Sequence, residues 1–167
     1  LLMFGIVADT GAFRYDNTTP RTLRDAADLL ESGADHHTVI TQTFFSKPLN
    51  YAQFEAELLA LHLKTAVDDR FAWFFIEPEL IEKYDIDLRN AEGLIEILRQ
   101  LDGTDIVAII TLQTDKYKIS LRSKDQKYSV GAIARQLNGG GHEMAAGCSV
   151  ETENLDTAEK QLLALVK

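Results

Sequence analysis

The clearest strand signals in the sequence are Ile106-Val-Ala-Ile-Ile-Thr-Leu112 and Lys116-Tyr-Lys-Ile-Ser-Leu-Arg122. The first run is almost entirely apolar, which is typical of a buried strand. The second alternates Tyr117, Ile119 and Leu121 with polar residues, which is typical of a strand with one exposed face. We therefore expect a β-sheet in the second half of the chain.

Strand and helix patterns alternate on both sides of these two runs. Leu59–Val67 and Arg70–Ile76 are β-like and are separated by Asp68-Asp69, which predicts a hairpin. Helices are predicted from Glu77, over 90–101, from Ser129 to Leu137 and over 154–166, with a short strand over 147–150. Such alternation predicts an α/β fold.

The beginning of the chain forms a separate pattern. Phe4–Val7 is short and apolar and runs into Ala8-Asp-Thr-Gly11, which predicts a buried strand followed by a tight turn. Asn17-Thr-Thr-Pro20 predicts the start of a helix, and Gly33 predicts its end. We expect one unit over 1–46, a linker over 47–57 and a second unit over 58–167.

The composition is that of an ordinary globular protein. The 167 residues include 26 acidic and 17 basic ones, and 46% are hydrophobic, which argues against disorder. A single cysteine, Cys148, excludes an internal disulfide and favours a reducing cytoplasmic location. No apolar run approaches the roughly 20 residues that span a bilayer, so we expect no membrane partner.

Charge is distributed unevenly along the chain. The net charge is −9, yet the stretch from Lys116 to His142 contains six basic residues and one acid, Asp125. An acidic surface repels long nucleic acid, whereas a local basic patch attracts a small anion that carries a few phosphates. A solvated charged hairpin is the alternative interpretation of this stretch.

The first candidate binding element is Asn138-Gly-Gly-Gly-His142. We expect a loop in which the backbone N–H groups of Gly139, Gly140 and Gly141 point at one phosphate. His142, at the end of this loop, can donate a hydrogen bond to a phosphate oxygen. A flexible connection without a ligand is the alternative.

The second candidate is Arg122-Ser123, at the end of the basic strand. A guanidinium group matches a phosphate or carboxylate with two parallel hydrogen bonds. The alternative is a surface arginine paired with a nearby acid. One helix and one loop separate Arg122 from the glycine run, so both can fold onto the same side of the sheet.

Two further acidic positions bear on metal binding. Asp9 follows the predicted strand, where a carboxylate can coordinate Mn²⁺ or Mg²⁺, or can instead cap its own turn. The triplet Asp35-His36-His37 follows the predicted helix end at Gly33. We expect Asp35 to be the N-cap of the next helix, with His36 and His37 on a polar face.

Two groups of residues resemble a known family. Phe4-Gly-Ile-Val-Ala-Asp-Thr-Gly-Ala-Phe13, with Gly33-Ala-Asp35, is similar to the last part of a DHH phosphoesterase domain. Lys118-Ile-Ser-Leu-Arg-Ser123 and Gly139-Gly-Gly-His-Glu-Met-Ala-Ala-Gly147 resemble the DHHA1 domain that follows it. The resemblance is to the bacterial nano-RNase and phosphoadenosine-phosphate phosphatase type. It implies that 1–46 is the C-terminal remnant of a DHH domain and 58–167 a mixed-sheet α/β DHHA1 domain.

The resemblance also implies roles for individual residues. Two Mn²⁺ ions in the DHH domain activate water in this family, and Asp9 matches the last metal-binding aspartate. The residues that match substrate contacts are Arg122, Ser123, Gly139, Gly140, Gly141 and His142. The earlier metal motifs do not occur in the 167 residues, and one aspartate cannot build a two-metal site. We therefore expect an inactive fragment of a larger enzyme, and its catalytic residues stay unknown.

The function implied by the resemblance is Mn²⁺-dependent hydrolysis of short oligoribonucleotides or of 3′-phosphoadenosine 5′-phosphate. Two alternatives stay open. One is a phosphodiesterase for a signalling dinucleotide, linear or cyclic di-AMP. The other is a module that binds nucleotide phosphate without catalysis. Formation of a homodimer also stays open.

Overall fold

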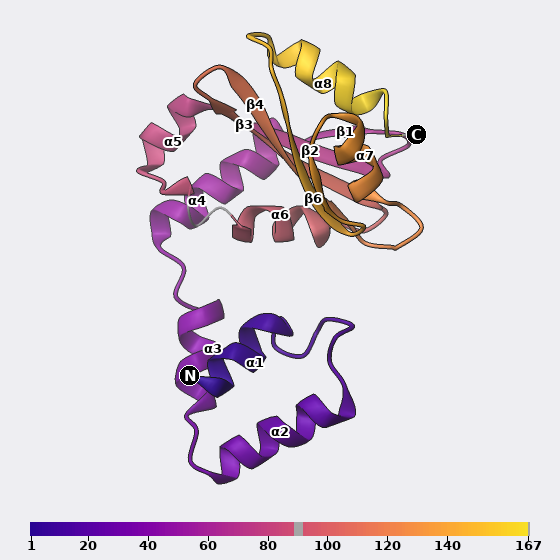
Figure 1. Cartoon of the computed structure of the whole chain (residues 1–167). Helices are drawn as coiled ribbons and strands as arrows, with labels where there is room; N and C mark the ends of the chain where they lie inside the picture. The colour runs from indigo at the N-terminus through magenta and orange to yellow at the C-terminus, as the bar shows by residue number, and fades with distance from the viewer. Residues whose placement is uncertain (89–91, 167) are drawn as a thin grey trace. The chain divides into compact units, whose positions relative to one another are not determined.

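A computed structural model describes residues 1–88 and 92–166 of the chain. The chain divides into two compact units, unit 1 (Leu1–Pro48) and unit 2 (Leu49–Lys167) (Figure 1). The described part of unit 1 is helical, whereas unit 2 contains a six-stranded sheet. The predicted α/β fold is therefore confirmed in unit 2.

Unit 1 consists of three helices: α1 (Leu2–Asp9), α2 (Pro20–Glu31) and α3 (His36–Phe44). Helix α2 begins where the sequence predicts it, because the Thr19 side chain accepts a hydrogen bond from the backbone N–H of Thr22 and Pro20 occupies the first turn. Past its end, Gly33 has a φ of 86°, a left-handed conformation that glycine adopts without strain.

The strand predicted over Phe4–Val7 is wrong, because these residues belong to helix α1. Met3 and Val7 are the buried residues of this helix, and they lie one turn apart on the same side. An apolar run of four residues is compatible with either a strand or a buried helical turn, so its periodicity does not distinguish them. The Asp9-Thr10-Gly11 motif consequently follows a helix rather than a strand.

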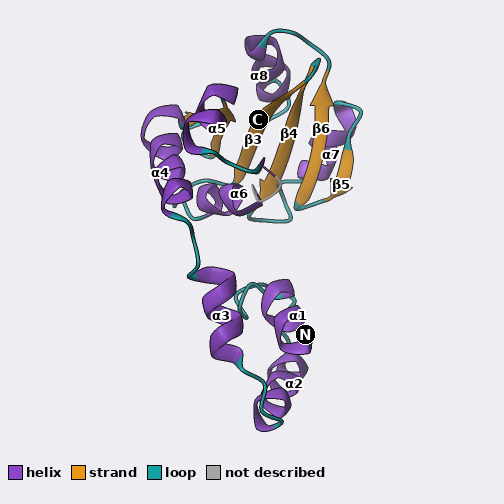
Figure 2. Ribbon diagram, turned by 90° about the vertical axis from the view of Figure 1, so that its left-hand side faces the viewer, coloured by secondary structure: helices purple, strands orange, loops and turns teal. Residues whose placement is uncertain are grey.

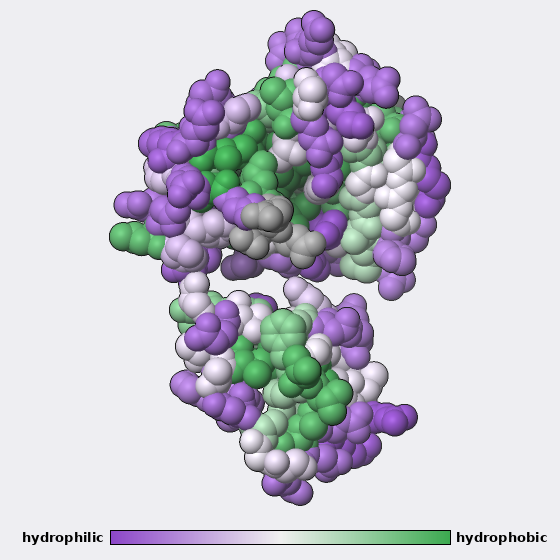
Figure 3. Space-filling view, turned by 60° about the vertical axis from the view of Figure 1, so that its left-hand side comes forward, coloured by the Kyte–Doolittle hydropathy of each residue, from purple (hydrophilic) through white to green (hydrophobic). Residues whose placement is uncertain are grey.

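The apolar core of unit 1 is small. Met3, Val7 and Ala26 are its buried members. Several large apolar side chains of the unit are exposed, and Figure 3 shows apolar surface on this body. These side chains are Leu1, Leu2, Phe4, Leu23, Leu30, Phe44 and Phe45.

The described part of unit 2 contains six strands and the helices that cover them. The strands are β1 (Lys64–Ala66), β2 (Phe71–Ile76), β3 (Ile106–Gln113), β4 (Lys116–Ser123), β5 (Gly140–His142) and β6 (Ala145–Val150). The helices are α4 (Leu49–Glu57), the π-helix η1 (Leu58–His62), α5 (Pro78–Tyr84), α6 (Glu92–Arg99), α7 (Val130–Gln136) and α8 (Leu155–Leu163). The strand order is β1-β2-β3-β4-β6-β5, with β2 and β3 parallel and the other pairs antiparallel, so the sheet is mixed.

The predicted hairpin between the first two strands is confirmed, but its first strand is short. β1 pairs antiparallel with β2 through Thr65 and Ala72. The first part of the predicted run Leu59–Val67 forms η1 instead. Leu58 is fully buried at the start of this helix, so packing against the core outweighs the β-like composition.

The segment 47–57, expected to be a linker, contains helix α4. Phe54 of this helix is fully buried in an apolar cluster with Phe74 of β2 and Leu94 of α6. Most of the expected linker is thus part of the folded core of unit 2.

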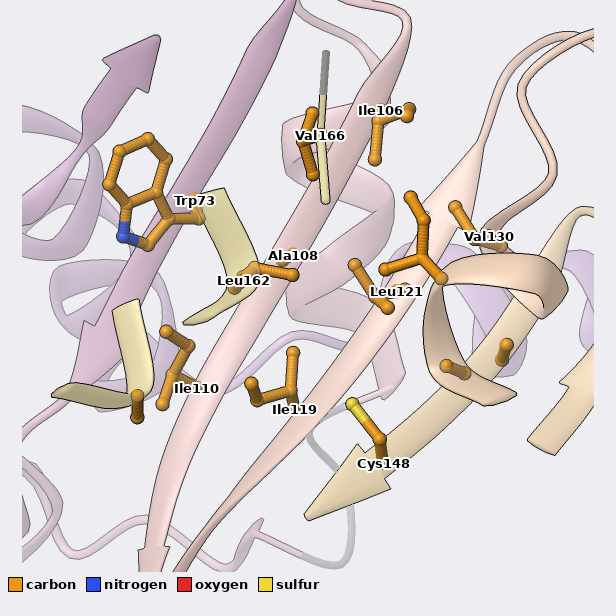
Figure 4. Close-up of a cluster of buried hydrophobic side chains, with 14 of the residues drawn as sticks. Trp73, Ile106, Ala108, Ile110, Ile119, Leu121, Val130, Cys148, Leu162 and Val166 are labelled. Carbon is orange, nitrogen blue, oxygen red and sulfur yellow. The ribbon is translucent and has the colours of Figure 1, made fainter. Parts of the chain in front are cut away.

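Two apolar layers cover the sheet. Helices α7 and α8 pack on one face, over Ile110, Ile119 and Cys148 (Figure 4). Helices α4, α5 and α6 pack on the other face, over Phe74 and Ile109. Residues Tyr117, Ile119 and Leu121 are buried, which confirms the alternation expected for β4.

Several other expected elements are present with shifted bounds. The helix expected from Glu77 is α5, the one from Ser129 is α7, and the strand expected over 147–150 begins at Ala145. The helix expected over 90–101 is described from Glu92 to Arg99, and Asn90 and Ala91 lie outside the described residues. None of the described helices is long and apolar enough to cross a bilayer.

Candidate functional site

Arg122 and His142 lie in one row across the sheet. In the pairing of β4 with β6, Arg122 is opposite Ala145, and in the pairing of β5 with β6, Ala145 is opposite His142. Residues opposite one another in neighbouring strands project to the same face. Two strand spacings separate the two backbones, or about 10 Å. The guanidinium and imidazole groups, 20 residues apart in the sequence, therefore border the same surface.

This surface, here called the open face, is the side of β4, β6 and β5 opposite α7. Its residues belong to neither apolar core of unit 2. Figure 2 shows β6 and β5 with α7 behind them and no helix in front. The open face consists of Lys118, Ser120, Arg122, Gly140, His142, Ala145, Gly147 and Ser149.

The middle of the open face is nearly flat. Gly140 is opposite Gly147, and Gly147 is opposite Ser120, so the central row contains two glycines and a serine. Cationic side chains lie on either side of this row, at Lys118 and Arg122. An anion can therefore approach the backbone closely between two positive groups.

The loop expected over Asn138–Gly141 is confirmed at Asn138 and Gly139 but is wrong at Gly140 and Gly141, which belong to strand β5 and pair with β6. A nest needs successive N–H groups that converge, whereas those of a strand alternate in direction. The phosphate cradle expected from three converging N–H groups is therefore replaced by a flat strand. Asn138 has a φ of 57°, a left-handed conformation, and turns the chain from α7 into β5.

The three glycines of this run differ in whether the fold leaves room for a side chain. A Cβ on Gly139 would lie 2.2 Å from the carbonyl oxygen of Gly147. A Cβ on Gly141 would lie 2.5 Å from the carbonyl oxygen of Ala145, and Gly141 has a φ of 138°. A Cβ on Gly140 would meet no atom within 4 Å. The fold thus explains Gly139 and Gly141, but it leaves Gly140 without a packing reason.

Arg122 is half-buried in its strand. Its Nη1 donates a hydrogen bond of 3.0 Å to the carbonyl oxygen of Leu121. In the described part of the chain no carboxylate pairs with this guanidinium. The alternative interpretation of a surface arginine neutralised by an acid is therefore not observed.

Ser123 has a different environment from its neighbour. Its side chain is buried, and its Oγ donates a hydrogen bond of 2.7 Å to the carbonyl oxygen of Asp125. Its backbone N–H donates to the carbonyl oxygen of Met144 at 3.0 Å. Ser123 therefore joins the end of β4 to the β5–β6 turn, and its hydroxyl is already engaged in a turn.

The N-terminus of α7 holds the β5–β6 turn next to His142. The backbone N–H of Val130 donates to the carbonyl oxygen of Glu143 at 2.9 Å. The Glu143 carboxylate accepts hydrogen bonds from Ser129 and Arg135, and these contacts lower the pKa of Glu143 from its ordinary value. A Cβ on Gly131 would lie 3.0 Å from the carbonyl oxygen of His142, so the helix approaches this strand closely.

A groove lies at the other end of the open face, and the sequence analysis did not assign it. It has a volume of about 910 Å³. Lys116, Lys118, Gly140 and Ser149 line it, whereas Arg122 and His142 do not. The excess of basic residues after Lys116 is the sequence signal that could have indicated it.

The candidate metal residues lie in unit 1. Asp9 is exposed at the end of α1, and its Oδ2 accepts a hydrogen bond of 3.0 Å from Asn17 Nδ2. Among the described residues, no three His, Cys, Asp or Glu side chains form a metal-binding group. Asp35 accepts a hydrogen bond of 2.9 Å from the backbone N–H of Thr38, which confirms its role as the N-cap of α3.

Most of unit 2 matches a model of a known domain family. The model of the DHHA1 domain matches residues 55–167. The chain therefore belongs to the DHHA1 domain family. The matched region contains all six strands and every residue of the open face.

Curated relatives and a solved structure resemble the chain over nearly its whole length. It is 29% identical over 166 residues to the bifunctional oligoribonuclease and PAP phosphatase NrnA of Thermus thermophilus, covering 99% of this chain and 49% of that protein. It is 28% identical over 172 residues to the A-adding tRNA nucleotidyltransferase of Aquifex aeolicus, covering 20% of that protein. A crystal structure of an exopolyphosphatase-related protein from Bacteroides fragilis has a TM-score of 0.87 and 22% identity, covering 96% of this chain and 47% of that one.

The chain corresponds to only part of each of these proteins. The chain spans about half of the NrnA relative and of the exopolyphosphatase-related protein. In the nucleotidyltransferase, the same region accompanies a different reaction. The likeness to the Bacteroides structure, at 22% identity, shows the fold.

Proposed function

We propose that unit 2 binds the phosphates of a short oligoribonucleotide or of 3′-phosphoadenosine 5′-phosphate for a phosphoesterase. The observation that carries the proposal is the row of Arg122, Ala145 and His142 across three strands. The name of the Thermus relative, an oligoribonuclease and PAP phosphatase, supports this choice of substrate class.

The chemistry of the row suits a phosphate. A guanidinium group donates two hydrogen bonds in the geometry that two phosphate oxygens accept. Imidazole adds an N–H donor from the opposite side of the row and a positive charge when protonated. Ala145 between them and the glycine pair Gly140 and Gly147 in the next row are small, so they leave the surface open to a ligand.

Manganese remains part of the proposed activity through the resemblance to DHH phosphoesterases. The described residues do not fit a two-metal site by themselves, because Asp9 is exposed and no group of three ligating side chains accompanies it. Hard divalent cations need several oxygen or imidazole ligands each. The described residues of this chain therefore do not supply the hydrolytic step by themselves.

A second candidate is a module that recognises nucleotide phosphate without catalysing a reaction. The match to an A-adding tRNA nucleotidyltransferase favours it, because there the region accompanies other chemistry. A signalling dinucleotide, linear or cyclic di-AMP, would present the same groups to Arg122 and His142, so it remains an alternative substrate.

The binding test uses isothermal titration of the chain with the dinucleotide pApA. Arg122→Ala and His142→Ala are each expected to weaken binding about 10-fold or more, because a hydrogen bond to a charged group contributes about 1.5–3 kcal/mol. Arg24→Ala, which removes an exposed arginine of unit 1, is the control and should bind like the wild type. Unchanged binding by both open-face variants would contradict the proposed site.

The catalytic test uses the full-length protein. With Mn²⁺ it is expected to hydrolyse pApA or 3′-phosphoadenosine 5′-phosphate, and cyclic di-AMP serves as the competing substrate. Asp9→Ala should remove most of this rate while circular dichroism stays unchanged. Binding of pApA without hydrolysis of any of these substrates would favour the recognition module instead.

A further inference from the structure

The turn that follows His142 is fixed by contacts with two neighbouring elements. Glu143 and Met144 form this two-residue turn between β5 and β6. The backbone N–H of Ser123, at the end of β4, donates a hydrogen bond of 3.0 Å to the carbonyl oxygen of Met144. The backbone N–H of Val130, at the start of α7, donates one of 2.9 Å to the carbonyl oxygen of Glu143. Both turn residues are therefore held by the main chain of neighbouring elements.

The Glu143 side chain adds a third attachment. Its carboxylate accepts hydrogen bonds from the Ser129 hydroxyl and, at 3.2 Å, from Arg135 Nη2. Ser129 is the N-cap residue of α7, and Arg135 lies in the last turn of this helix. These contacts, the Ser129 hydrogen bond above all, hold the pKa of Glu143 below its ordinary value, so the carboxylate is charged near neutral pH. Glu143 therefore joins the turn to both ends of α7.

These side-chain contacts lie at the surface of the unit. The side chains of Arg135 and Glu143 are 55% and 56% exposed. Water and salt screen such a pair, and exposed ion pairs contribute little to protein stability. Strand β5 also contributes no side chain to the described apolar cores. The Glu143 contacts therefore orient the turn locally, and we expect the stability of the domain not to depend on them.

The charge of Glu143 opposes the binding of an anion at the neighbouring residue. A carboxylate next to His142 repels a phosphate group, so removing this negative charge would by itself favour phosphate binding. Arg135 offsets part of the charge through its ion pair with Glu143. The carboxylate contacts α7, which lies on the side of the sheet opposite the open face. Glu143 can therefore hold its neighbour in place without contacting the ligand.

We propose that Glu143 is a positioning residue for His142. By fastening the β5–β6 turn to Ser129 and Arg135, it fixes the backbone from which the imidazole projects onto the open face. This inference rests on the proposed function and deepens it, because it names a residue that sets phosphate affinity from outside the open face. A side chain that is already held in its binding geometry loses less freedom when the ligand binds.

The test is isothermal titration of three variants with pApA. Glu143→Ala is expected to bind pApA about threefold to tenfold more weakly than the wild type, because the lost orientation of His142 outweighs the removal of a negative charge. Glu143→Gln keeps an oxygen that accepts a hydrogen bond from Ser129, so it should restore most of the affinity. Glu153→Ala removes the same side chain at an exposed position beyond the other end of β6, and it should not weaken binding.

A double-mutant cycle shows whether the effect of Glu143 passes through His142. In a His142→Ala background, Glu143→Ala should no longer weaken binding, because the side chain that it orients is absent. Urea denaturation should give Glu143→Ala the midpoint of the wild type. The positioning role is overturned if Glu143→Ala binds as tightly as Glu143→Gln, if its effect persists without His142, or if its urea midpoint falls clearly. Each of these results leaves the proposed function intact, whereas wild-type binding by both Arg122→Ala and His142→Ala would overturn both.

Discussion

Gly140 lies directly opposite Gly147 in the pairing of β5 with β6, and both positions have room for a methyl group. A Cβ on Gly147 would make an ordinary contact of 3.4 Å with the carbonyl oxygen of Ile119, and one on Gly140 would meet nothing. The fold does not require these two residues to lack side chains. Both glycines lie between the rows of Lys118 and Arg122. The absence of side chains at these two positions lets a ligand approach the backbone closely.

Gly140→Ala and Gly141→Ala form a matched pair that separates ligand binding from folding. Gly140→Ala should fold normally and bind pApA more weakly, because its methyl group projects onto the open face. Gly141→Ala should lower the free energy of unfolding by about 2–4 kcal/mol, since it combines a left-handed φ with a backbone clash. Urea denaturation and calorimetric titration measure the two effects. Wild-type affinity of Gly140→Ala would contradict the ligand explanation.

Glu159 is expected to stabilise the attachment of α8 to the sheet. Its Oε1 accepts a hydrogen bond of 2.9 Å from Trp73 Nε1, and the carboxylate also pairs with Lys64 Nζ at 2.8 Å. Glu159→Ala leaves the buried indole N–H without an acceptor and should cost about 2–4 kcal/mol of unfolding free energy. Trp73 is the only tryptophan in the sequence, so its fluorescence reports the change directly.

Two further variants calibrate this prediction. Glu159→Gln keeps a side-chain oxygen for Trp73 and should cost less than Glu159→Ala. Lys160→Ala, at an exposed position of the same helix, should change the unfolding free energy by less than about 0.5 kcal/mol. If Glu159→Ala were no more destabilising than Lys160→Ala, the hydrogen bond to Trp73 would have no role in stability.

Cys148 is expected to react slowly with thiol reagents in the native protein. Burial raises the pKa of its thiol from 9.0 to about 11, and the thiolate is the reactive form. Because folding raises this pKa, the native state favours the protonated thiol. The stability contributed by this group is therefore complete below pH 9 and is lost as the pH rises toward about 11.

The measurement is the rate of labelling by a coloured disulfide reagent near pH 8. The native chain should react much more slowly than the chain in urea, where the thiol is exposed and burial no longer raises its pKa. Cys148→Ser should abolish the signal and identifies the labelled residue. Labelling of the native chain as fast as that of the unfolded chain would show that β6 is not packed under α7 and α8.

The sequence predicts best those features that depend on repeating patterns. The alternation of Tyr117, Ile119 and Leu121 identifies β4 and its buried face because a strand has a period of two residues. Capping also depends on local chemistry, so Asp35 could be assigned as an N-cap without knowledge of the rest of the fold. The resemblance to DHHA1 domains then supplied the family, which the match over residues 55–167 shows.

The features that were missed depend on tertiary contacts. Phe4–Val7 is too short for its periodicity to separate a strand from a helix, and packing with Ala26 accompanies the helical form. The glycine run was expected to be a loop because three glycines favour one. Its pairing with Ala145–Gly147 depends on small residues in both strands, which allow the two backbones to approach. The groove at Lys118 extends past the last residues of β6 that pair with β5. No local sequence pattern predicts where that pairing ends.

Strand β5 lies at the edge of the sheet, and this location affects how the ligand preference of the domain can change. The strand is three residues long, contacts only β6 and α7 in substantial number, and contributes no side chain to the apolar cores. Changing Gly140, where a side chain would meet no other atom, alters which ligands fit at the sheet margin and leaves the closely packed Gly141 and both apolar cores as they are. Substitution at this one position is thus a route by which the scaffold can acquire new ligand preferences at little risk to its stability.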